Sequence, residues 1–268
     1  MREGDVRTVR DTDLPYYQGT FYRASVRSVL GDRETQQDAY VLSEQDDWVL
    51  GVVCDGMGGM NSGERASTKA VESLQTQFLD AVEAGLENVP QFFARAAARA
   101  DRAVWGLKDE NGRKCEAGTT IVAVAVKDGM MSWLSVGDSK LFIYRNGQML
   151  CPVKMHNCRT MLEEKLARGA ITREAYEEEI GRGEALTSYL GLGNIQMIET
   201  NRSPFRLLSG DMVLLCSDGL YRKVPEDEIR EILLERRPVE EKTGFLVDAA
   251  LAADGPHDNT TVLLFEFY

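Results

Sequence analysis

Short β-rich runs occur in two blocks of this chain, and they constrain the fold more than any other feature of the sequence. The first block covers residues 21–26, 38–42 and 48–54, and the second covers 119–126, 131–136, 140–145 and 148–150. Asn146-Gly147 separates the last two runs and is typical of a tight hairpin turn. Because the strands follow one another instead of alternating singly with helices, the pattern favours an α+β fold with mostly antiparallel sheets.

Apolar residues at helical spacing predict longer helices between the strand blocks and near the end of the chain. These helices cover about 63–82, 90–107, 227–236 and 239–252, and further strands are expected at 212–216 and 260–267. No repeat or low-complexity linker divides the sequence. We therefore expect a single domain over residues 1–268, with a polar lead-in at 1–20 and a core drawn from both ends of the chain.

Residues 153–195 differ in character from the rest of the chain. They contain two short, charged helical patterns, at 160–168 and 172–180, which are separated by Gly169. These patterns carry too few apolar positions to bury a helix in the core. We expect this segment to be an exposed insertion, or flap.

The net charge of the chain limits the kinds of partner that it can bind, and its cysteines indicate the cellular compartment. With 43 acidic and 31 basic side chains, the formal net charge is −12, which disfavours a nucleic acid or an anionic membrane as main partner. The five cysteines form no C-x-x-C pair, and no signal peptide or membrane-spanning apolar run of ~20 residues is visible. We expect a soluble, cytoplasmic protein in which Cys54 and Cys216 are reduced, inert packing residues.

Five aspartates share an unusual setting at the borders of predicted strands. They are Asp38, Asp55, Asp138, Asp218 and Asp258. One aspartate beside a glycine is usually a turn residue, but a carboxylate at a buried strand end must be paired or must bind a cation. The obvious basic residues nearby are Arg33 and Lys140. Divalent cations with oxygen ligands, magnesium or manganese rather than zinc, would account for all five positions together.

The glycine-rich run Asp55-Gly56-Met57-Gly58-Gly59 does not fit a nucleotide-binding loop. Asn61 stands where the dinucleotide fingerprint requires its last glycine, and the sequence contains no Gly-Lys-Ser/Thr. A nucleophile elbow of the G-x-S-x-G type is also missing. We expect these glycines to turn the backbone tightly beside Asp55, so that a main-chain carbonyl can reach a metal ion.

Short motifs around these aspartates follow one another in a recognisable order. They are Gly31-Asp32-Arg33, Gln37-Asp38-Ala39, Asp55-Gly56-Met57-Gly58-Gly59, Gly63-Glu64-Arg65-Ala66-Ser67, Gly118-Thr119-Thr120, Gly137-Asp138-Ser139-Lys140, Ser217-Asp218-Gly219-Leu220 and Asp258-Asn259-Thr260. In this order they resemble the metal-dependent type-2C (PPM) protein serine/threonine phosphatases of bacterial type. The resemblance extends from about Phe21 to Phe267, and segment 156–191 resembles the flap of bacterial members.

The resemblance implies two metal ions, Mn²⁺ or Mg²⁺, held by this set of residues. Asp55 would bridge the two ions, and the carbonyl of Gly56 would bind the second. Asp218 and Asp258 would complete the first site, and Asp38 would hold the second ion through water.

The resemblance also implies a third ion, a phosphate ligand and an architecture. Asp138 would join Asp218 in a third metal site, and Arg33 would bind the substrate phosphate. From the residues alone, Arg33 has an alternative role as a surface ion-pair partner of Asp32 or Glu34. The implied fold is a four-layer α-β-β-α sandwich of two packed antiparallel sheets flanked by helices.

The chain departs from the family pattern at several positions. Gln36 and Gln37 stand where Asn and Glu are frequent, so the second ion would lose a nearby charge. Met57 replaces a histidine that many eukaryotic members use as a proton donor, and Ser188 replaces a basic flap residue. His156 and His257 are either further proton donors or, as the favoured interpretation, surface or turn residues.

The expected activity is hydrolysis of phosphoserine and phosphothreonine in proteins by a metal-activated water, without a phosphoenzyme. Expected partners are phosphorylated proteins, with a cognate serine/threonine kinase or its targets as a candidate. Two alternatives stay open: a catalytically weak regulatory module of the same fold that binds phosphoproteins, and a hydrolase of small phosphoesters.

Overall fold

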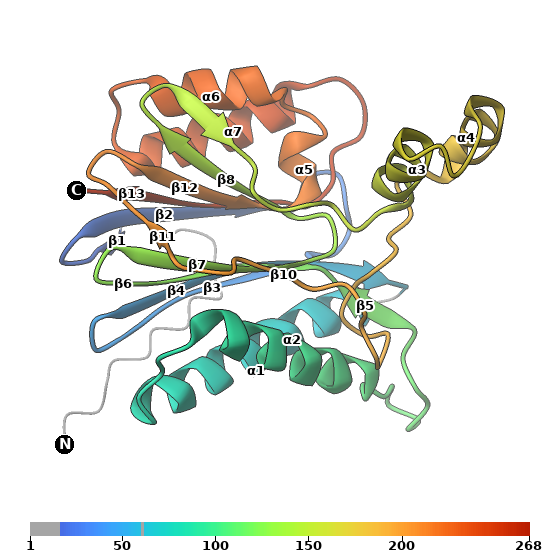
Figure 1. Ribbon diagram of the computed structural model, residues 1–268, viewed down its shortest axis with the longest axis horizontal. Coiled ribbons are helices and arrows are strands. Elements are labelled where there is room, and N and C mark those ends of the chain that lie inside the picture. Colours follow the sequence, from blue (N-terminus) through green and yellow to red (C-terminus); the bar gives the residue numbers. More distant parts are fainter. Residues whose placement is uncertain (1–16, 60–61) are drawn as a thin grey trace.

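Two antiparallel sheets lie face to face and are covered by helices on their outer sides (Figure 1). The computed structural model describes residues 17–59 and 62–268. In order across the first sheet, the strands are β1 (Tyr17–Gln18), β2 (Tyr22–Val29), β13 (Thr260–Phe267), β12 (Met212–Cys216), β8 (Lys140–Arg145) and β9 (Gln148–Leu150). Every neighbouring pair in this sheet is antiparallel.

The second sheet combines the last two strands of the first block of the sequence with the earlier strands of the second block. Its order is β10 (Glu199–Thr200), β7 (Met130–Val136), β6 (Ile121–Lys127), β4 (Trp48–Gly58) and β3 (Asp38–Gln45), with β11 (Phe205–Arg206) also on β7 and β5 (Ala117–Thr119) also on β4. All of these pairs are antiparallel as well.

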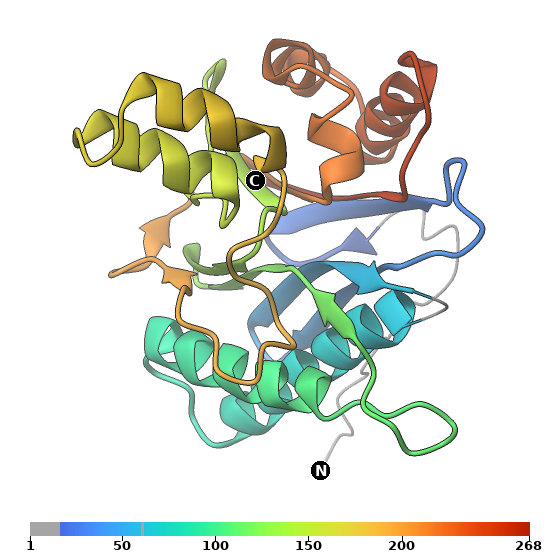
Figure 2. The ribbon, with the colours of Figure 1, turned by 90° about the vertical axis from the view of Figure 1, so that its right-hand side faces the viewer.

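The helices occupy three places around the sheets. Helices α1 (Ser62–Glu83) and α2 (Val89–Trp105) cover the second sheet, and α6 (Glu226–Leu234) and α7 (Val239–Ala252) cover the first (Figure 1). The flap helices α3 (Cys158–Ala167) and α4 (Arg173–Glu179), with the 3₁₀ turn η1 (Ile180–Arg182), project from one end of the sandwich (Figures 1 and 2). The single-turn helix α5 (Asp218–Tyr221) lies at the same end.

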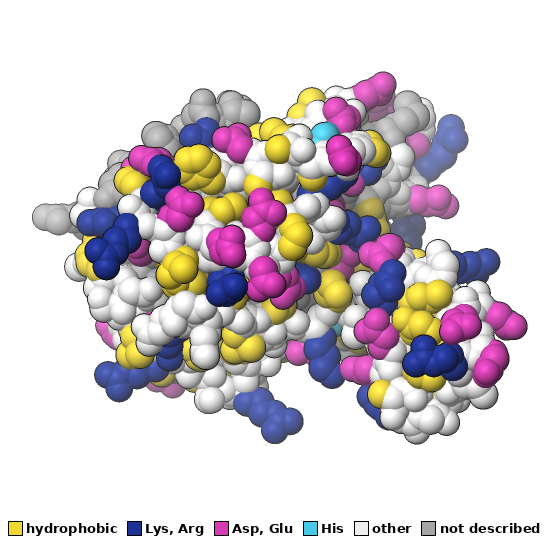
Figure 3. All heavy atoms as spheres, turned by 90° about the horizontal axis from the view of Figure 1, so that it is seen from above, with side chains coloured by type: hydrophobic (Ala, Val, Ile, Leu, Met, Phe, Trp, Pro, Cys, Tyr) yellow, Lys and Arg dark blue, Asp and Glu magenta, His cyan; other side chains and the backbone are white. Residues whose placement is uncertain are grey.

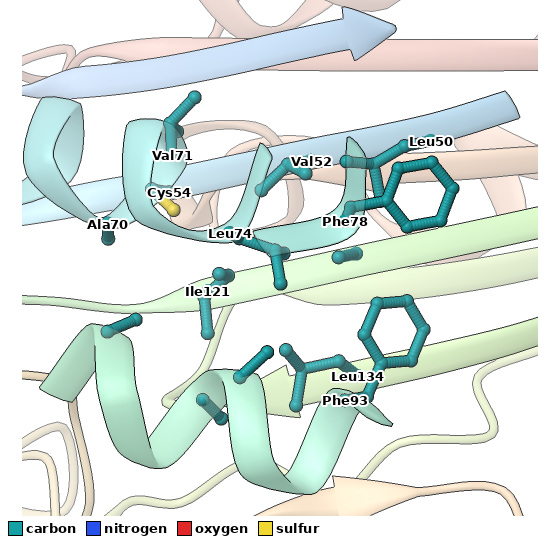
Figure 4. Packing of buried hydrophobic residues seen from close by; sticks show 14 of the residues in the cluster. Leu50, Val52, Cys54, Ala70, Val71, Leu74, Phe78, Phe93, Ile121 and Leu134 are labelled. Atoms are coloured by element: carbon teal, nitrogen blue, oxygen red, sulfur yellow. The ribbon is translucent and has the colours of Figure 1, made fainter. Parts of the chain in front are cut away.

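Three clusters of buried apolar residues separate these four layers. One lies between α1, α2 and the second sheet, one lies between the two sheets, and one lies between the first sheet and α6 and α7. In β4, Leu50, Val52 and Cys54 face the helices (Figure 4), whereas Val49 and Val53 face the other sheet. Because side chains alternate along a strand, both faces of β4 are buried, which is why its sequence is almost continuously apolar.

The four-layer α+β sandwich predicted from the sequence is confirmed by this architecture. The predicted turn after Cys54 is wrong, because β4 continues through Gly58 and its Gly56 pairs with Thr119 of β5. The predicted strand 119–126 is two strands, β5 and β6, which Thr120 separates. Residues 1–16 of the predicted lead-in lie outside the described residues, and Tyr17–Gln18 form β1.

The outer surface mixes charges of both signs. On the face formed by α6 and α7, acidic and basic side chains are interspersed instead of forming a field of one sign (Figure 3). Within residues 17–59 and 62–268, no helix is both long and apolar enough to cross a membrane.

Candidate metal centre

The fold brings the five predicted aspartates together, since the other four are all near enough to Asp55 to act on its carboxyl group by repulsion. Asp55 lies near the end of β4, and Asp38, the first residue of β3, is its direct partner across the ladder. Asp218 directly follows Ser217, after β12, and Asp258 lies two residues before the adjacent strand β13. Asp138 lies in the connection from β7 to β8, which links the two sheets. We call these five residues the acidic site.

Buried Asp38 and half-buried Asp55 place two carboxyl groups opposite each other in the sheet, which is unfavourable for their charged forms unless a cation is near. One carboxylate oxygen of Asp38 accepts a hydrogen bond of 2.7 Å from the Ser217 hydroxyl, and the other has no partner among the described residues. Burial raises the pKa of Asp38 to about 7. Burial, followed by repulsion from Asp38 and the other three aspartates, raises the pKa of Asp55 well above its ordinary value.

Two glycines allow the segments of the acidic site to approach closely. A Cβ on Gly56 would lie 2.2 Å from the carbonyl oxygen of Gly63, at the start of α1. A Cβ on Gly219 would lie 2.2 Å from the carbonyl oxygen of Asn259. A larger residue at either position would therefore push α1 away from β4, or α5 away from the loop that carries Asp258.

Arg33 pairs with a residue of the acidic site. Its guanidinium lies 2.6 Å from the Asp258 carboxylate, and the two side chains are 60% and 41% exposed. The alternative in which Arg33 pairs with Asp32 or Glu34 is wrong, because its ion pair among the described residues is with Asp258, while Asp32 accepts hydrogen bonds from the backbone and ring of His257. The exposed guanidinium at the rim of the site is in a suitable place to bind a phosphate group.

Arg222 is a site residue that the sequence did not reveal. Its Nε lies 2.8 Å from Asp218, and its Nη2 lies 3.1 Å from Asp138. Lys140, one of the two basic residues noted near the aspartates in the sequence, pairs with Glu226 at 2.8 Å. The sequence could have indicated the contact with Asp218, because Arg222 follows it by four residues and side chains at this spacing meet on a helix.

The donor set of the acidic site suits a hard divalent cation. Among the described residues, no group of three or more aspartate, glutamate, histidine or cysteine side chains is positioned to hold a metal ion as it stands. However, a nearby positive charge would stabilise both the unpartnered oxygen of buried Asp38 and the charged form of Asp55, which the other aspartates repel. Carboxylate oxygens favour magnesium or manganese, so these residues fit the two expected ions. At Asp138 and Asp218 positive charge is already present in Arg222.

The two histidines have structural contacts. His156 is buried, not on the surface as the favoured interpretation had it, and its Nδ1 accepts a hydrogen bond of 3.1 Å from the Gly137 backbone. His257 has both ring nitrogens engaged, one with Asp32 at 2.9 Å and the other with the Ala253 carbonyl at 2.8 Å. These contacts favour structural roles over proton donation for both residues.

The burial of His156 predicts that acid destabilises the fold through this residue. Burial lowers its pKa from 6.5 to about 4. As the pH falls below about 6.5 the unfolded chain therefore binds a proton that the folded protein does not, until the pH reaches about 4. The free energy of unfolding should fall by about 3 kcal/mol over this interval.

Urea unfolding of wild type and of His156→Asn between pH 7 and pH 4.5 measures this contribution. Asparagine retains an acceptor for the Gly137 N–H but does not titrate. The variant should therefore show a shallower loss of stability in acid. Equal pH slopes for the two proteins would contradict the prediction.

The positions that depart from the family pattern have defined contacts. The Gln36 side chain accepts a hydrogen bond of 2.9 Å from the Asp38 backbone, and that of Gln37 donates one of 3.2 Å to the Gly58 carbonyl. Ser188 is buried and donates to the Met197 carbonyl. Cys54 and Cys216 are free and fully buried, as predicted, and burial raises the pKa of both thiols.

Two packed antiparallel sheets, an acidic site at their strand ends and an arginine at its rim define a metal-dependent phosphatase. The family model described as protein phosphatase 2C matches residues 27–253. The chain therefore belongs to the protein phosphatase 2C family, and its activity is that of a metal-dependent protein serine/threonine phosphatase.

Individual relatives agree with this membership. The serine/threonine phosphatase stp of Listeria monocytogenes is 29% identical over 227 residues, which cover 84% of this chain and 87% of that protein. The serine/threonine phosphatase of S. agalactiae has the same fold, with a TM-score of 0.80, 24% identity and coverage of 92% of this chain and 100% of that one. The catalytic domain of the phosphatase PstP, solved in complex with two manganese ions, gives a TM-score of 0.71 at 24% identity, covering 92% and 98%.

Proposed function

We propose that this phosphatase acts at the acidic site on phosphoserine and phosphothreonine of protein substrates. Asp55 would bridge two ions, Gly56 would contribute its carbonyl, Asp218 and Asp258 would complete the first site, and Asp38 would hold the second. The direct pairing of Asp55 with buried Asp38, one of whose carboxylate oxygens has no partner among the described residues, is the observation that carries the proposal. The two manganese ions of the PstP complex support the number of ions, and Mn²⁺ and Mg²⁺ both suit the donors.

The residues of the chain divide the work of the reaction between them. Bound divalent cations would activate a water molecule and neutralise charge on the phosphoryl group. Arg33 would orient the phosphate through two parallel N–H bonds, once its guanidinium leaves Asp258. Cys54 and Cys216 are no nucleophiles, since burial and the raised pKa of their thiols disfavour the thiolate. Neither cysteine would therefore form a phosphoenzyme, and the proposed reaction is direct attack by a water molecule on the phosphoryl group.

The requirement for divalent ions is the direct test of this proposal. A phosphothreonine peptide should be hydrolysed with Mn²⁺ or Mg²⁺, and excess chelator should abolish the activity reversibly, because the buried aspartates cannot act on phosphate by themselves. Asp218→Ala should lose activity even with saturating Mn²⁺. Hydrolysis that survives chelation, or survives Asp218→Ala, would contradict the two-metal assignment.

The same assay separates the alternatives. A small-phosphoester hydrolase would prefer a chromogenic phosphate ester to the peptide, and a regulatory module would bind a phosphoprotein without hydrolysing it. The small-ester alternative is not favoured, because the family model and the relatives that the chain matches are protein phosphatases. The regulatory alternative is not favoured, because Asp55, Asp218 and Asp258 are all present beside Arg33. Phosphorylated proteins are therefore the proposed substrates, and a cognate serine/threonine kinase or its targets the proposed partners.

The organisation of the chain and its location belong to the proposal as well. Residues 1–268 would form one phosphatase domain, because β2 and β13 from opposite ends of the chain pair along their full length. Residues 153–195 would act as a flap. Its helices α3 and α4 project from the sandwich (Figure 2), and its Glu184 lies 3.3 Å from Arg222, the residue that pairs with Asp138 and Asp218. The five free cysteines support a cytoplasmic, reducing location.

A further inference from the structure

Arg222 connects three carboxylates that belong to two different parts of the molecule. It follows α5, and its guanidinium lies 2.8 Å from Asp218, 3.1 Å from Asp138 and 3.3 Å from Glu184. Asp138 and Asp218 belong to the acidic site, whereas Glu184 belongs to the flap segment 153–195. One side chain therefore contacts both the acidic site and the flap.

The contacts with Asp138 and Asp218 place a permanent positive charge where a third metal ion would bind. The side chains of Asp138 and Asp218 are 5% and 16% exposed, so their charges need a partner inside the protein. Among the described residues, Arg222 is the basic side chain that forms an ion pair with each of them. Because a guanidinium does not lose its proton in proteins, a divalent ion could bind both carboxylates only after displacing Arg222.

The contact with Glu184 extends this ion pair into the flap. One Glu184 oxygen accepts hydrogen bonds of 3.1 and 2.9 Å from Arg159, in the first turn of α3, and the other faces Arg222. The backbone N–H of Arg159 also donates to the Gly183 carbonyl, at 2.8 Å. Glu184 is thus fixed to the base of α3, and Arg222 ties that base to the core.

We propose that Arg222 replaces a third metal ion at Asp138 and Asp218 and holds the flap to the acidic site through Glu184. Arg222 is a positioning residue: among the described residues its ion pairs are with Asp138, one oxygen of Asp218 and Glu184, which leaves Asp38, Asp55, Asp258 and the other oxygen of Asp218 for the two ions. The wild-type protein then binds two Mn²⁺ ions. This inference rests on the proposed assignment of the acidic site.

Counting bound Mn²⁺ by equilibrium dialysis and calorimetry tests the replacement. Wild type and Arg222→Lys, which keeps the positive charge, should bind two ions up to millimolar Mn²⁺, and Arg222→Gln should bind three. Arg222→Gln combined with Asp138→Asn should return to two, because the new site loses a ligand. Three ions in wild type, or two ions in a folded Arg222→Gln variant, would overturn the proposal. If the glutamine variant fails to fold, the number of ions bound by wild type still tests the proposal. Wild type that binds no Mn²⁺ would instead reject the metal assignment itself.

Hydrogen exchange of the flap tests the second contact. Glu184→Gln keeps Arg222 on the aspartates and removes only the charge on the flap, so it should bind two ions while exchange in α3 becomes at least about threefold faster. Arg222→Gln should accelerate exchange in α3 similarly. Arg230→Gln, which removes an exposed ion pair with Asp227 on α6, is the matched control and should change neither the count nor the exchange. Unchanged exchange in both Glu184→Gln and Arg222→Gln would overturn the link to the flap.

Discussion

Asp55→Asn should hydrolyse a phosphothreonine peptide on the order of a thousandfold more slowly than wild type at saturating Mn²⁺. Asp55 is the central member of the acidic site, since the other four aspartates all raise its pKa by repulsion. Asparagine has nearly the same size but lacks the negative charge that would hold two cations. We therefore expect the loss mainly in kcat/KM, with little change in structure.

The same substitution should stabilise the protein in chelator. In chelator the metal-free wild type contains Asp55 opposite Asp38 in the register of β3 and β4, where burial and repulsion from Asp38 disfavour its charged form. Asparagine removes that repulsion, so the free energy of unfolding should rise by about 1 kcal/mol. Thermal unfolding in chelator measures this gain, and Asp80→Asn, on the exposed side of α1, is the control that should change neither quantity. An active Asp55→Asn enzyme, or one destabilised in chelator, would contradict the proposed role.

Asp101→Ala should lower the free energy of unfolding by about 3 kcal/mol or more. Asp101 on α2 is 1% exposed, and its carboxylate accepts hydrogen bonds from the backbone N–H groups of Gly191 at 2.8 Å, Gly193 at 3.0 Å and Ile195 at 3.2 Å. Alanine would leave these three donors without an acceptor in a largely buried position. The segment that returns from the flap to the second sheet would then lose its attachment to α2.

Urea unfolding of a small series distinguishes this attachment from a general effect of removing an acidic residue. Asp101→Asn retains one oxygen for Gly191 and Gly193 but turns an amide toward Ile195, so its loss should lie between those of wild type and Asp101→Ala. Asp80→Ala removes an exposed carboxylate from α1 and should change stability by less than about 0.5 kcal/mol. Equal stabilities for Asp101→Ala and wild type would show that water replaces the carboxylate.

The sequence predicted strands most directly where a strand is buried on both of its faces. The apolar runs of β4 and β12 could be read directly because each strand lies between two of the apolar clusters. The abrupt change from these runs to Asp55 and Asp218 marked the acidic site for the same reason. In both cases a local pattern reflects the environment of the residue.

Other features depend on contacts between distant parts of the chain. The contact of Arg222 with Asp138 joins residues 84 positions apart, and only its spacing from Asp218 was local. The continuation of β4 through Gly58 depends on pairing with β5, which outweighs the tendency of glycine to end a strand. His156 lies in a charged, exposed-looking segment, but its contact with Gly137 buries it.

The pairing of β2 with β13 also limits when this enzyme can become active during its synthesis. Val29 pairs with Thr260 and Tyr22 with Phe267, so the first sheet cannot be completed until Phe267 has left the ribosome. Contacts between residues so far apart in sequence form slowly. Asp258 lies two residues before β13, so the last proposed metal ligand is synthesised just before the strand that completes the first sheet. A nascent chain that lacks this strand should therefore remain without phosphatase activity.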